Sequence, residues 1–281
     1  MAPVELARGP LRLVLRPDVG GSIAGLWREG TAVLRACDPG ALASPLDAAC
    51  YPLVPYSNRL GFRRFEWLGR AYTTAPNFGA SPHSLHGVGW QRPWRIVSQG
   101  ADEVALALAH AGDADWPFAF EAEQRFALGE RGLRIDAGFT NTAAVAAPVG
   151  LGWHPFFPRR ARSHLRADVT HRWQNDASGL PARSVPQSGI DARVSDLHYD
   201  DCFDGWNGAA RIDDELLSIA IVAPWTRLVV YTPGHEDWYC VEPVSHVNDA
   251  LNMPDPASRG MRVLEPGETE RAWMRLEIAP R

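Results

Sequence analysis

The sequence predicts an all-β protein built from large antiparallel sheets, and two observations support this prediction. Apolar and polar residues alternate with a period of two in segments spread along the whole chain. Helical periodicity is nearly absent, and the 25 glycines and 23 prolines fall repeatedly between the alternating segments, as turn residues do. The chain has 281 residues, of which 46% are hydrophobic, so it is long enough to bury a sizeable core. We therefore expect one β-sandwich domain over residues 1–281, with few short helices.

The expected strands each present one apolar face and one polar face. The clearest alternating segments are residues 11–16, 118–126, 133–140 and 274–278. An apolar run also begins near Leu228 and leads to Glu242. Because Pro243 has no backbone N–H, we expect it to end that strand and to leave Glu242 at the rim of a sheet, partly out of water. One short helix is predicted within residues 41–49.

Composition narrows the chemistry that the chain can perform. All 28 basic residues are arginines, so neither Schiff-base catalysis by a lysine nor a P-loop lysine is available. The formal net charge of −5 gives no reason to expect a nucleic-acid partner or an anionic membrane partner. The 4 cysteines are dispersed and predict neither a zinc site nor a disulfide framework.

The location expected from the sequence is cytoplasmic. The first residues lack the basic and apolar regions of a signal peptide. No apolar run approaches the length of a membrane span. We expect a monomer or a homodimer.

Polar side chains interrupt the alternating pattern in five short segments, namely residues 55–60, 83–90, 150–157, 199–206 and 239–246. Arg59 in the first segment can fork onto sugar hydroxyls or a carboxylate, although a surface arginine in a loop is the commoner case. In the second segment, His83 and His86 are three residues apart, as in a helical metal pair. Pro82 and the nearby glycines argue against a helix, so hydrogen bonding near a ligand or a structural role is favoured over metal binding.

The later segments combine aromatic and acidic residues. Trp153 or Phe157 could form a platform for the C–H face of a sugar, with His154 beside it, whereas a buried aromatic cluster is the plainer interpretation. Asp200 and Trp206 lie in a segment that could orient a polyol or could simply form an acidic turn. The roles of His83 and His246 stay open.

In this order, the five segments resemble the aldose 1-epimerase (galactose mutarotase) family across nearly the whole chain. The matching motifs are Asn58-Arg59, Leu85-His86-Gly87, His154-Pro155-Phe156-Phe157, Asp200-x-Cys202-Phe203 and Val241-Glu242-Pro243. The resemblance implies a β-supersandwich and interconversion of α and β anomers of a hexose or related aldose, with no cofactor and no metal. It also implies that Glu242 is the catalytic base and His154 the acid, and that Arg59, His86 and Asp200 bind and orient the sugar. We expect Asn58, Trp153 and Trp206 to contact the sugar as well.

Two positions depart from the common family pattern. Trp153 stands where many galactose mutarotases have asparagine, and Asp201 stands where many have histidine. The chain is more similar to a compact bacterial branch, and these departures leave the identity of the sugar open.

Three alternatives remain at this stage. Glu242 and Asp200 could be the acid/base pair of a glycoside hydrolase or lyase. The chain could also bind carbohydrate without turning it over, because folds are reused for unrelated functions. Within the main interpretation, the sugar could be phosphorylated, with arginines supplying the phosphate site: Arg63, Arg64, Arg92 and Arg95.

Overall fold

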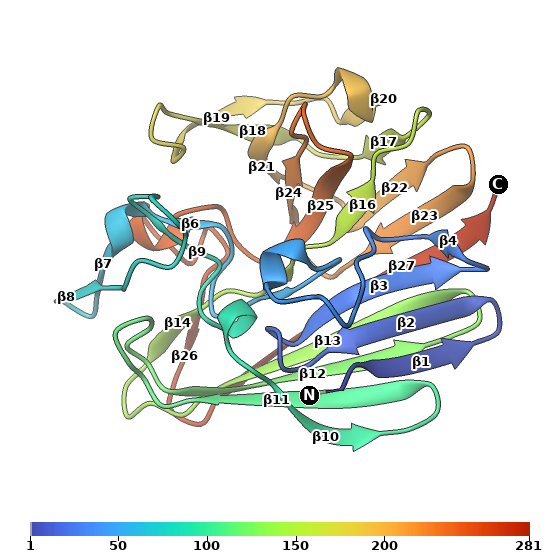
Figure 1. Ribbon diagram of the computed structural model, residues 1–281. Coiled ribbons are helices and arrows are strands. Elements are labelled where there is room, and N and C mark those ends of the chain that lie inside the picture. The colour runs from blue at the N-terminus through green and yellow to red at the C-terminus, as the bar shows by residue number, and fades with distance from the viewer. Residues whose placement is uncertain (1) are drawn as a thin grey trace.

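The computed structural model describes residues 2–281, and no α-helix occurs among them. The larger of its two main sheets has nine strands and, in Figure 1, extends from the bottom of the view up its right side. In spatial order, this sheet consists of β10 (Arg95–Gln99), β11 (Glu103–His110), β12 (Phe120–Leu128), β13 (Gly132–Asn141), β27 (Thr269–Pro280), β23 (Leu217–Val222), β22 (Ala209–Asp213), β17 (His164–Ala167) and β20 (Ile190–Arg193).

The second main sheet has eight strands, and those labelled in Figure 1 lie in the upper part of the view. Its strands in spatial order are β19 (Pro181–Pro186), β18 (His171–Asn175), β21 (Asp200–Asp204), β24 (Arg227–Tyr231), β25 (Trp238–Val244), β15 (Gly152–Trp153) and β5 (Pro52–Leu53), and β16 (Phe156–Pro158) also pairs with β25.

Smaller elements complete the fold. A four-stranded sheet contains β1 (Val4–Arg8), β2 (Leu11–Arg16), β3 (Ser22–Arg28) and β4 (Thr31–Ala32). Three two-stranded sheets pair β6 (Arg59–Leu60) with β9 (Ser84–Leu85), β7 (Arg64–Trp67) with β8 (Arg70–Thr73), and β14 (Ala147–Val149) with β26 (Arg262–Leu264). The 3-10 turns are η1 (Pro45–Asp47), η2 (Gly61–Arg63), η3 (Gly89–Gln91), η4 (Val194–Asp196) and η5 (Ala250–Asn252).

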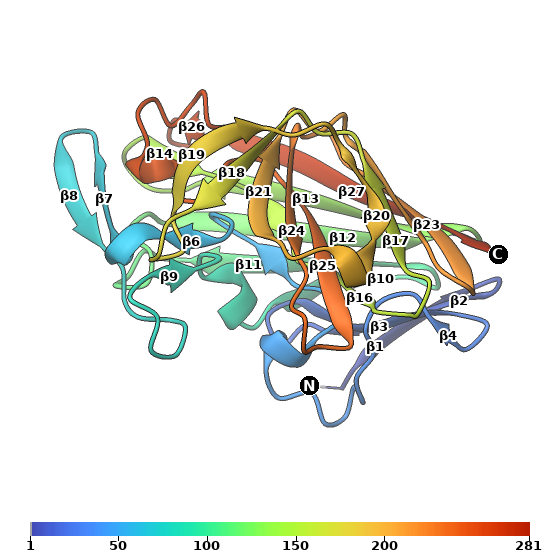
Figure 2. The ribbon, with the colours of Figure 1, turned by 90° about the horizontal axis from the view of Figure 1, so that it is seen from above.

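The three larger sheets share one buried core. The main cluster of buried side chains includes Leu13 of β2, Ile135 of β13 and Val241 of β25. Figure 2 shows the strands of the eight-stranded sheet crossing above those of the nine-stranded sheet. The indole Nε1 of Trp153 reaches between them and donates to Gln124 Oε1 at 3.2 Å. None of the helical turns in residues 2–281 is long and apolar enough to cross a membrane.

The prediction of an all-β fold with large antiparallel sheets is confirmed, and each predicted alternating segment falls on a strand. The helix expected within residues 41–49 is only the turn η1. The prediction that Pro243 ends its strand is wrong, because β25 runs on to Val244. Ser245 donates its N–H to Leu151 O at 2.9 Å, and Pro243, two residues earlier, has its backbone nitrogen on the same side of β25. The neighbour on that side, β15, ends at Trp153, so the strand loses no ladder hydrogen bond at Pro243. Glu242 therefore lies inside the sheet, not at its rim.

Candidate active site

Strand register brings Glu242 and His154 together. On one side of β25, Gly152 pairs with Val244 and Phe156 pairs with Cys240. His154 lies midway between those two pairs, so it falls opposite Glu242. Directly opposed residues of an antiparallel pair project on the same face and interact. Two residues that are 88 positions apart in the sequence are therefore neighbours across the sheet.

The two side chains form a close, buried pair. His154 Nε2 lies 3.4 Å from Glu242 Oε1, and the residues are only 7% and 1% exposed. Within the described chain, His154 Nδ1 and Glu242 Oε2 have no hydrogen-bond partner. Buried polar atoms are normally satisfied, so a pair with two unsatisfied atoms marks a place where a polar ligand can bind.

Burial controls the protonation of this pair. It raises the pKa of Glu242 well above its ordinary value, with the Asp200 charge adding to the effect and Arg59 opposing it. Burial also holds the pKa of His154 well below its ordinary value, assisted by His86 and Arg35. Both directions favour the neutral pair, in which the carboxyl carries the proton. The neutral pair and the ion pair differ only in the position of one proton.

His86 is held in one tautomer beside the pair. The Asn58 N–H donates to His86 Nδ1 at 3.0 Å, so the hydrogen of the neutral ring is on Nε2. Burial and the Arg59 charge lower the pKa of His86 to about 3, which keeps the ring neutral. Asn58 and His86 both have left-handed backbones, with φ of 59° each. Strain of this kind at two facing polar residues is typical of functional sites.

Arg59 and Asp200 form the second polar pair of the site. Arg59 Nη2 donates to Asp200 Oδ2 at 2.8 Å, and Nη1 reaches Asn58 Oδ1 at 3.4 Å. Asp200 begins β21 and pairs with Tyr231 of β24. Because β24 lies between β21 and β25, Asp200 and Glu242 are two strands apart in the sheet. Because each is a partner of the other, the two charges are fixed in position before any ligand binds.

These residues share one cavity of about 300 Å³. Its polar lining consists of Asn58, Arg59, His86, His154, Asp200 and Glu242. The remaining wall is largely aromatic and apolar and consists of Leu46, Tyr51, Phe78, Leu85, Phe156, Tyr231 and Trp238. A cavity with a few convergent polar groups and flat rings suits a ligand that has both hydroxyls and C–H faces.

Two tryptophans expected at the site do not line the cavity. Trp153 precedes His154, so the strand alternation turns it to the opposite face, where it is buried against Trp225. Trp206 is buried in the main core and donates to Ala209 O at 2.8 Å. Phe157, the other candidate platform, is also in the main core.

The two histidines of open role are structural. His83 Nδ1 accepts from the Phe62 N–H at 2.9 Å, and its Nε2 lies 2.9 Å from Ser178 O. His246 Nε2 accepts from the Ser57 N–H at 2.9 Å, and its Nδ1 lies 2.7 Å from Val247 O. Both rings thus satisfy backbone groups, and neither residue lines the cavity.

The aromatic wall contains residues that sequence reasoning missed. Phe156 and Trp238 are two and four residues from His154 and Glu242 on their respective strand segments. Period-two alternation places such residues on the face of the sheet that bears His154 and Glu242. This signal was therefore available in the sequence, whereas Leu46 and Phe78 come from a turn and a loop that no periodicity marks.

One group of side chains here could also hold a metal ion. Ligand atoms of His154, Cys240 and Glu242 lie within 4.8 Å of one another. An ion at this position would occupy both members of the buried pair, so metal binding and proton transfer by the pair would exclude each other.

Comparison with known proteins agrees with this architecture. The family model for aldose 1-epimerase matches residues 4–277. The uncharacterised protein YphB of Escherichia coli K12 is 32% identical over 295 aligned positions, which cover 99% of each chain. A solved structure from Escherichia coli K12, provisionally named an aldose 1-epimerase, has a TM-score of 0.91 and 30% identity and covers 100% of this chain and 99% of its own.

A more distant solved structure shares the fold. The galactose mutarotase-like protein of Clostridium acetobutylicum has a TM-score of 0.86 at 19% identity, covering 99% of this chain and 95% of its own. The extent of the family match and the similarity to YphB together decide the assignment: the chain belongs to the aldose 1-epimerase family.

Proposed function

We propose that the protein is a mutarotase that interconverts the α and β anomers of a free, unphosphorylated aldose. The observation that supports this most strongly is the buried His154–Glu242 pair, with Nε2 and Oε1 3.4 Å apart at one cavity. Mutarotation needs one group that removes a proton and another that supplies one, and nothing else is transferred. A carboxyl and an imidazole that share one proton meet that need.

The proposed reaction moves a proton through the sugar. Glu242 as carboxylate removes the proton of the anomeric hydroxyl while imidazolium His154 protonates the ring oxygen. The C1–O5 bond breaks and the electrons of the O1–H bond form the aldehyde carbonyl. Rotation about C1–C2 presents the other face of the carbonyl to the C5 hydroxyl, and the reverse transfers close the ring. Each proton transfer contributes about 10²–10⁴-fold to the rate.

Burial has a defined part in this cycle. After ring opening, Glu242 carries a proton and His154 is neutral, which is the form that burial of both groups favours. The site therefore stabilises the state in which the open-chain aldehyde exists. The Nε2–H of His86 and the Arg59–Asp200 pair are available to hold sugar hydroxyls during the rotation.

The charges lining the cavity favour a neutral sugar. Arg59 is the one arginine of the lining, and it is already paired with Asp200. The four arginines considered for a phosphate site do not line the cavity, and Arg92 instead pairs with Asp113 at 3.1 Å and with Asp115. A phosphate would thus meet carboxyl groups without an unpaired cation to balance its charge.

The alternatives have less support. A glycoside hydrolase would need Asp200 or another carboxyl as the partner of Glu242, but Asp200 is held by Arg59 whereas His154 faces Glu242 directly. A purely binding protein would not need a carboxyl and an imidazole that face each other and can exchange one proton.

Replacing Glu242 by glutamine tests the proposal. The amide fills the same space but cannot accept the proton, so we expect Glu242→Gln to fold and to lose at least about 10²-fold in the rate of anomerisation. Polarimetry of freshly dissolved α-glucose or α-galactose measures this rate above the spontaneous reaction. Asp201→Asn is the control, because the Asp201 carboxyl is half-buried in the same sheet but does not line the cavity. A Glu242→Gln protein as fast as wild type would exclude the proposed base.

A further inference from the structure

The His154 imidazole belongs to a contiguous stack of flat groups. It stacks on Phe156 with ring centroids 4.5 Å apart and an interplanar angle of 21°, and it also packs on Tyr51 at 4.7 Å. Next to Phe156, the guanidinium Cζ of Arg35 lies 3.9 Å from the ring centroid, a cation–π contact. Arg35 thus connects to the acid–base pair through one ring, although it does not line the cavity itself.

Arg35 also contacts three parts of the cavity wall. Its N–H donates to Phe156 O at 2.7 Å. Its Nη2 donates to Leu46 O at 2.7 Å and to Ala48 O, which ties down the turn η1. Its guanidinium lies 5.2 Å from the ring of Trp238. Leu46, Phe156 and Trp238 all line the cavity, so one side chain holds the turn and both strands of the wall.

The chemistry of these contacts suits arginine specifically. A planar guanidinium can stack on a ring and donate to carbonyl oxygens in its own plane, whereas an ammonium group is a point charge without a face. Among residues 2–281, Arg35 takes part in no ion pair within 4 Å, and the close contacts of its guanidinium are with aromatic rings and carbonyl oxygens. A cation placed this way is costly to desolvate, which argues that its position serves the wall it holds.

We propose that Arg35 is a positioning residue that fixes the plane of the His154 imidazole through Phe156. The same contacts hold the aromatic wall in place. The segment after β4 thereby links the four-stranded sheet to the site. This inference rests on the proposed mutarotase function for its kinetic consequences, but its structural consequence is independent of any sugar.

A double-mutant cycle on kcat tests the link. We expect Arg35→Met to lower kcat for anomerisation about tenfold, because small misplacement of a catalytic group has large effects on rate, with a smaller change in KM. Arg35→Lys restores the charge without the planar face, and its kcat stays within about threefold of Arg35→Met. In a Phe156→Leu background, Arg35→Met lowers kcat by less than about twofold, because the ring that transmits the effect is gone.

Matched controls separate positioning from general destabilisation. Arg12 of β2 also stacks on a ring, with its Cζ 4.8 Å from the ring centroid of Trp27, and it does not line the cavity. Arg12→Met should leave kcat unchanged. Equal losses of kcat from Arg35→Met in the wild-type and Phe156→Leu backgrounds, or an unaltered kcat in folded Arg35→Met, would overturn the inference.

An NMR measurement keeps the inference testable if the protein proves inactive on aldoses. The Hε1 resonance of His154, assigned with His154→Asn, is displaced by the ring current of Phe156 in the stack. We expect Arg35→Met and Arg35→Lys to move it toward the value of an unstacked histidine, and Arg12→Met to leave it in place. An unmoved resonance in both Arg35 variants would reject the positioning role whatever the enzyme's activity.

Discussion

Under the proposed function, single residues of the site divide into those that would move protons and those that would hold hydroxyls. His154 and Glu242 face each other with unsatisfied atoms, whereas Arg59 and Asp200 are already partners. This difference predicts different kinetic consequences when each is changed.

Replacing His154 and Arg59 should therefore split kcat from KM. We expect His154→Asn to lower kcat by about 10²–10⁴-fold, because the amide cannot protonate the ring oxygen. Arg59→Ala should mainly raise KM, since it removes a hydroxyl-binding group and releases Asp200. Initial rates by polarimetry over a range of sugar concentrations give both constants. If His154→Asn raised KM alone, the histidine would not be the acid.

Buried neutral histidines should make stability depend on pH. Burial lowers the pKa of His246 to about 4 and of His86 to about 3, from 6.5 in the unfolded chain. As the pH falls below about 6.5, the unfolded chain binds protons that the folded chain refuses, so stability falls toward pH 4. His154 acts in the same direction, while the raised pKa of Glu242 opposes it with a single proton.

Urea unfolding between pH 7.5 and 4.5 measures this dependence. We expect the free energy of unfolding to fall with pH, and His246→Gln to flatten the curve. His235→Gln is the control, because the His235 side chain is 81% exposed. A free energy of unfolding that rose steadily from pH 7.5 to 4.5 would contradict the assignment of neutral buried histidines.

The sequence indicated much of the site at this scale. Glu242, His154, Arg59, His86, Asp200 and Asn58 were all singled out from short motifs, and all line one cavity. Their catalytic and binding roles remain predictions. Trp153 does not line this cavity, because strand alternation turns the residue next to His154 to the opposite face of the sheet.

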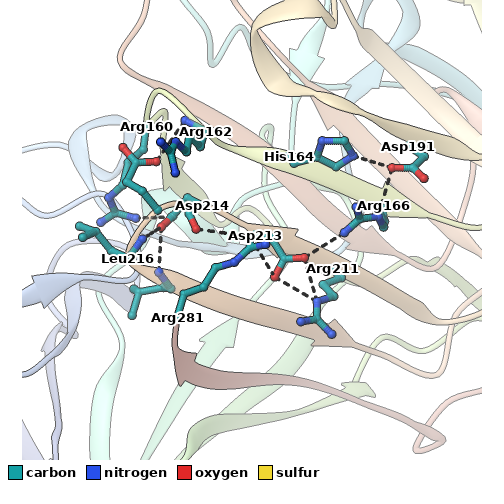
Figure 3. A network of polar contacts seen from close by, with 12 residues as sticks. Arg160, Arg162, His164, Arg166, Asp191, Arg211, Asp213, Asp214, Leu216 and Arg281 are labelled. Atoms are coloured by element: carbon teal, nitrogen blue, oxygen red, sulfur yellow. Dashed lines mark hydrogen bonds and ion pairs between the residues drawn. The ribbon is translucent and has the colours of Figure 1, made fainter.

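At the scale of elements, one buried carboxylate holds the turn of a hairpin that does not line the cavity. Asp214 follows β22, is 2% exposed, and accepts from the N–H groups of Leu216 and Leu217 at 2.7 and 2.8 Å. It also accepts from Arg160 at 2.6 Å. Figure 3 shows this carboxylate beside Asp213, which pairs with Arg166, Arg211 and Arg281.

Removing that carboxylate should destabilise the protein without changing the site. We expect Asp214→Ala to lower the free energy of unfolding by about 3 kcal/mol, because it leaves buried donors and a cation unpaired. Asp191→Ala is the control, since Asp191 pairs with His164 and Arg166 but its side chain is 69% exposed, and such pairs contribute about 0–1 kcal/mol. Urea unfolding measures both, and equal effects would show that burial of Asp214 does not decide its contribution.

Strands were predictable where apolar and polar residues alternate strongly, whereas the prediction failed where the end of a strand depends on its partner strand. The alternating segments fell on β2, β12, β13 and β27. The prediction for Pro243 was wrong because a strand tolerates a proline where the neighbouring strand ends and no ladder hydrogen bond is lost. That condition depends on β15, which lies far away in the sequence and carries no signal that it would be the partner.

At the scale of the whole molecule, alternation establishes the fold class but not the order of strands. In the nine-stranded sheet, β27 lies between β13 and β23, so the last strand occupies a central position. Such an arrangement follows from the packing of all sheets around one core and cannot be read from local patterns. The core draws on side chains from β1 to β27, which supports our expectation of one domain.

The proposed mutarotase function requires the protein to accelerate anomer exchange of neutral aldoses. Two-dimensional exchange NMR on glucose, galactose and their 6-phosphates, with and without protein, measures the α–β exchange rate of each sugar directly. We predict a protein-dependent increase in the exchange rate for at least one free aldose and a much smaller increase for its 6-phosphate. The proposed function would be contradicted if the protein left the exchange rate unchanged for every aldose in a broad panel, or if it accelerated exchange more for the phosphorylated sugars.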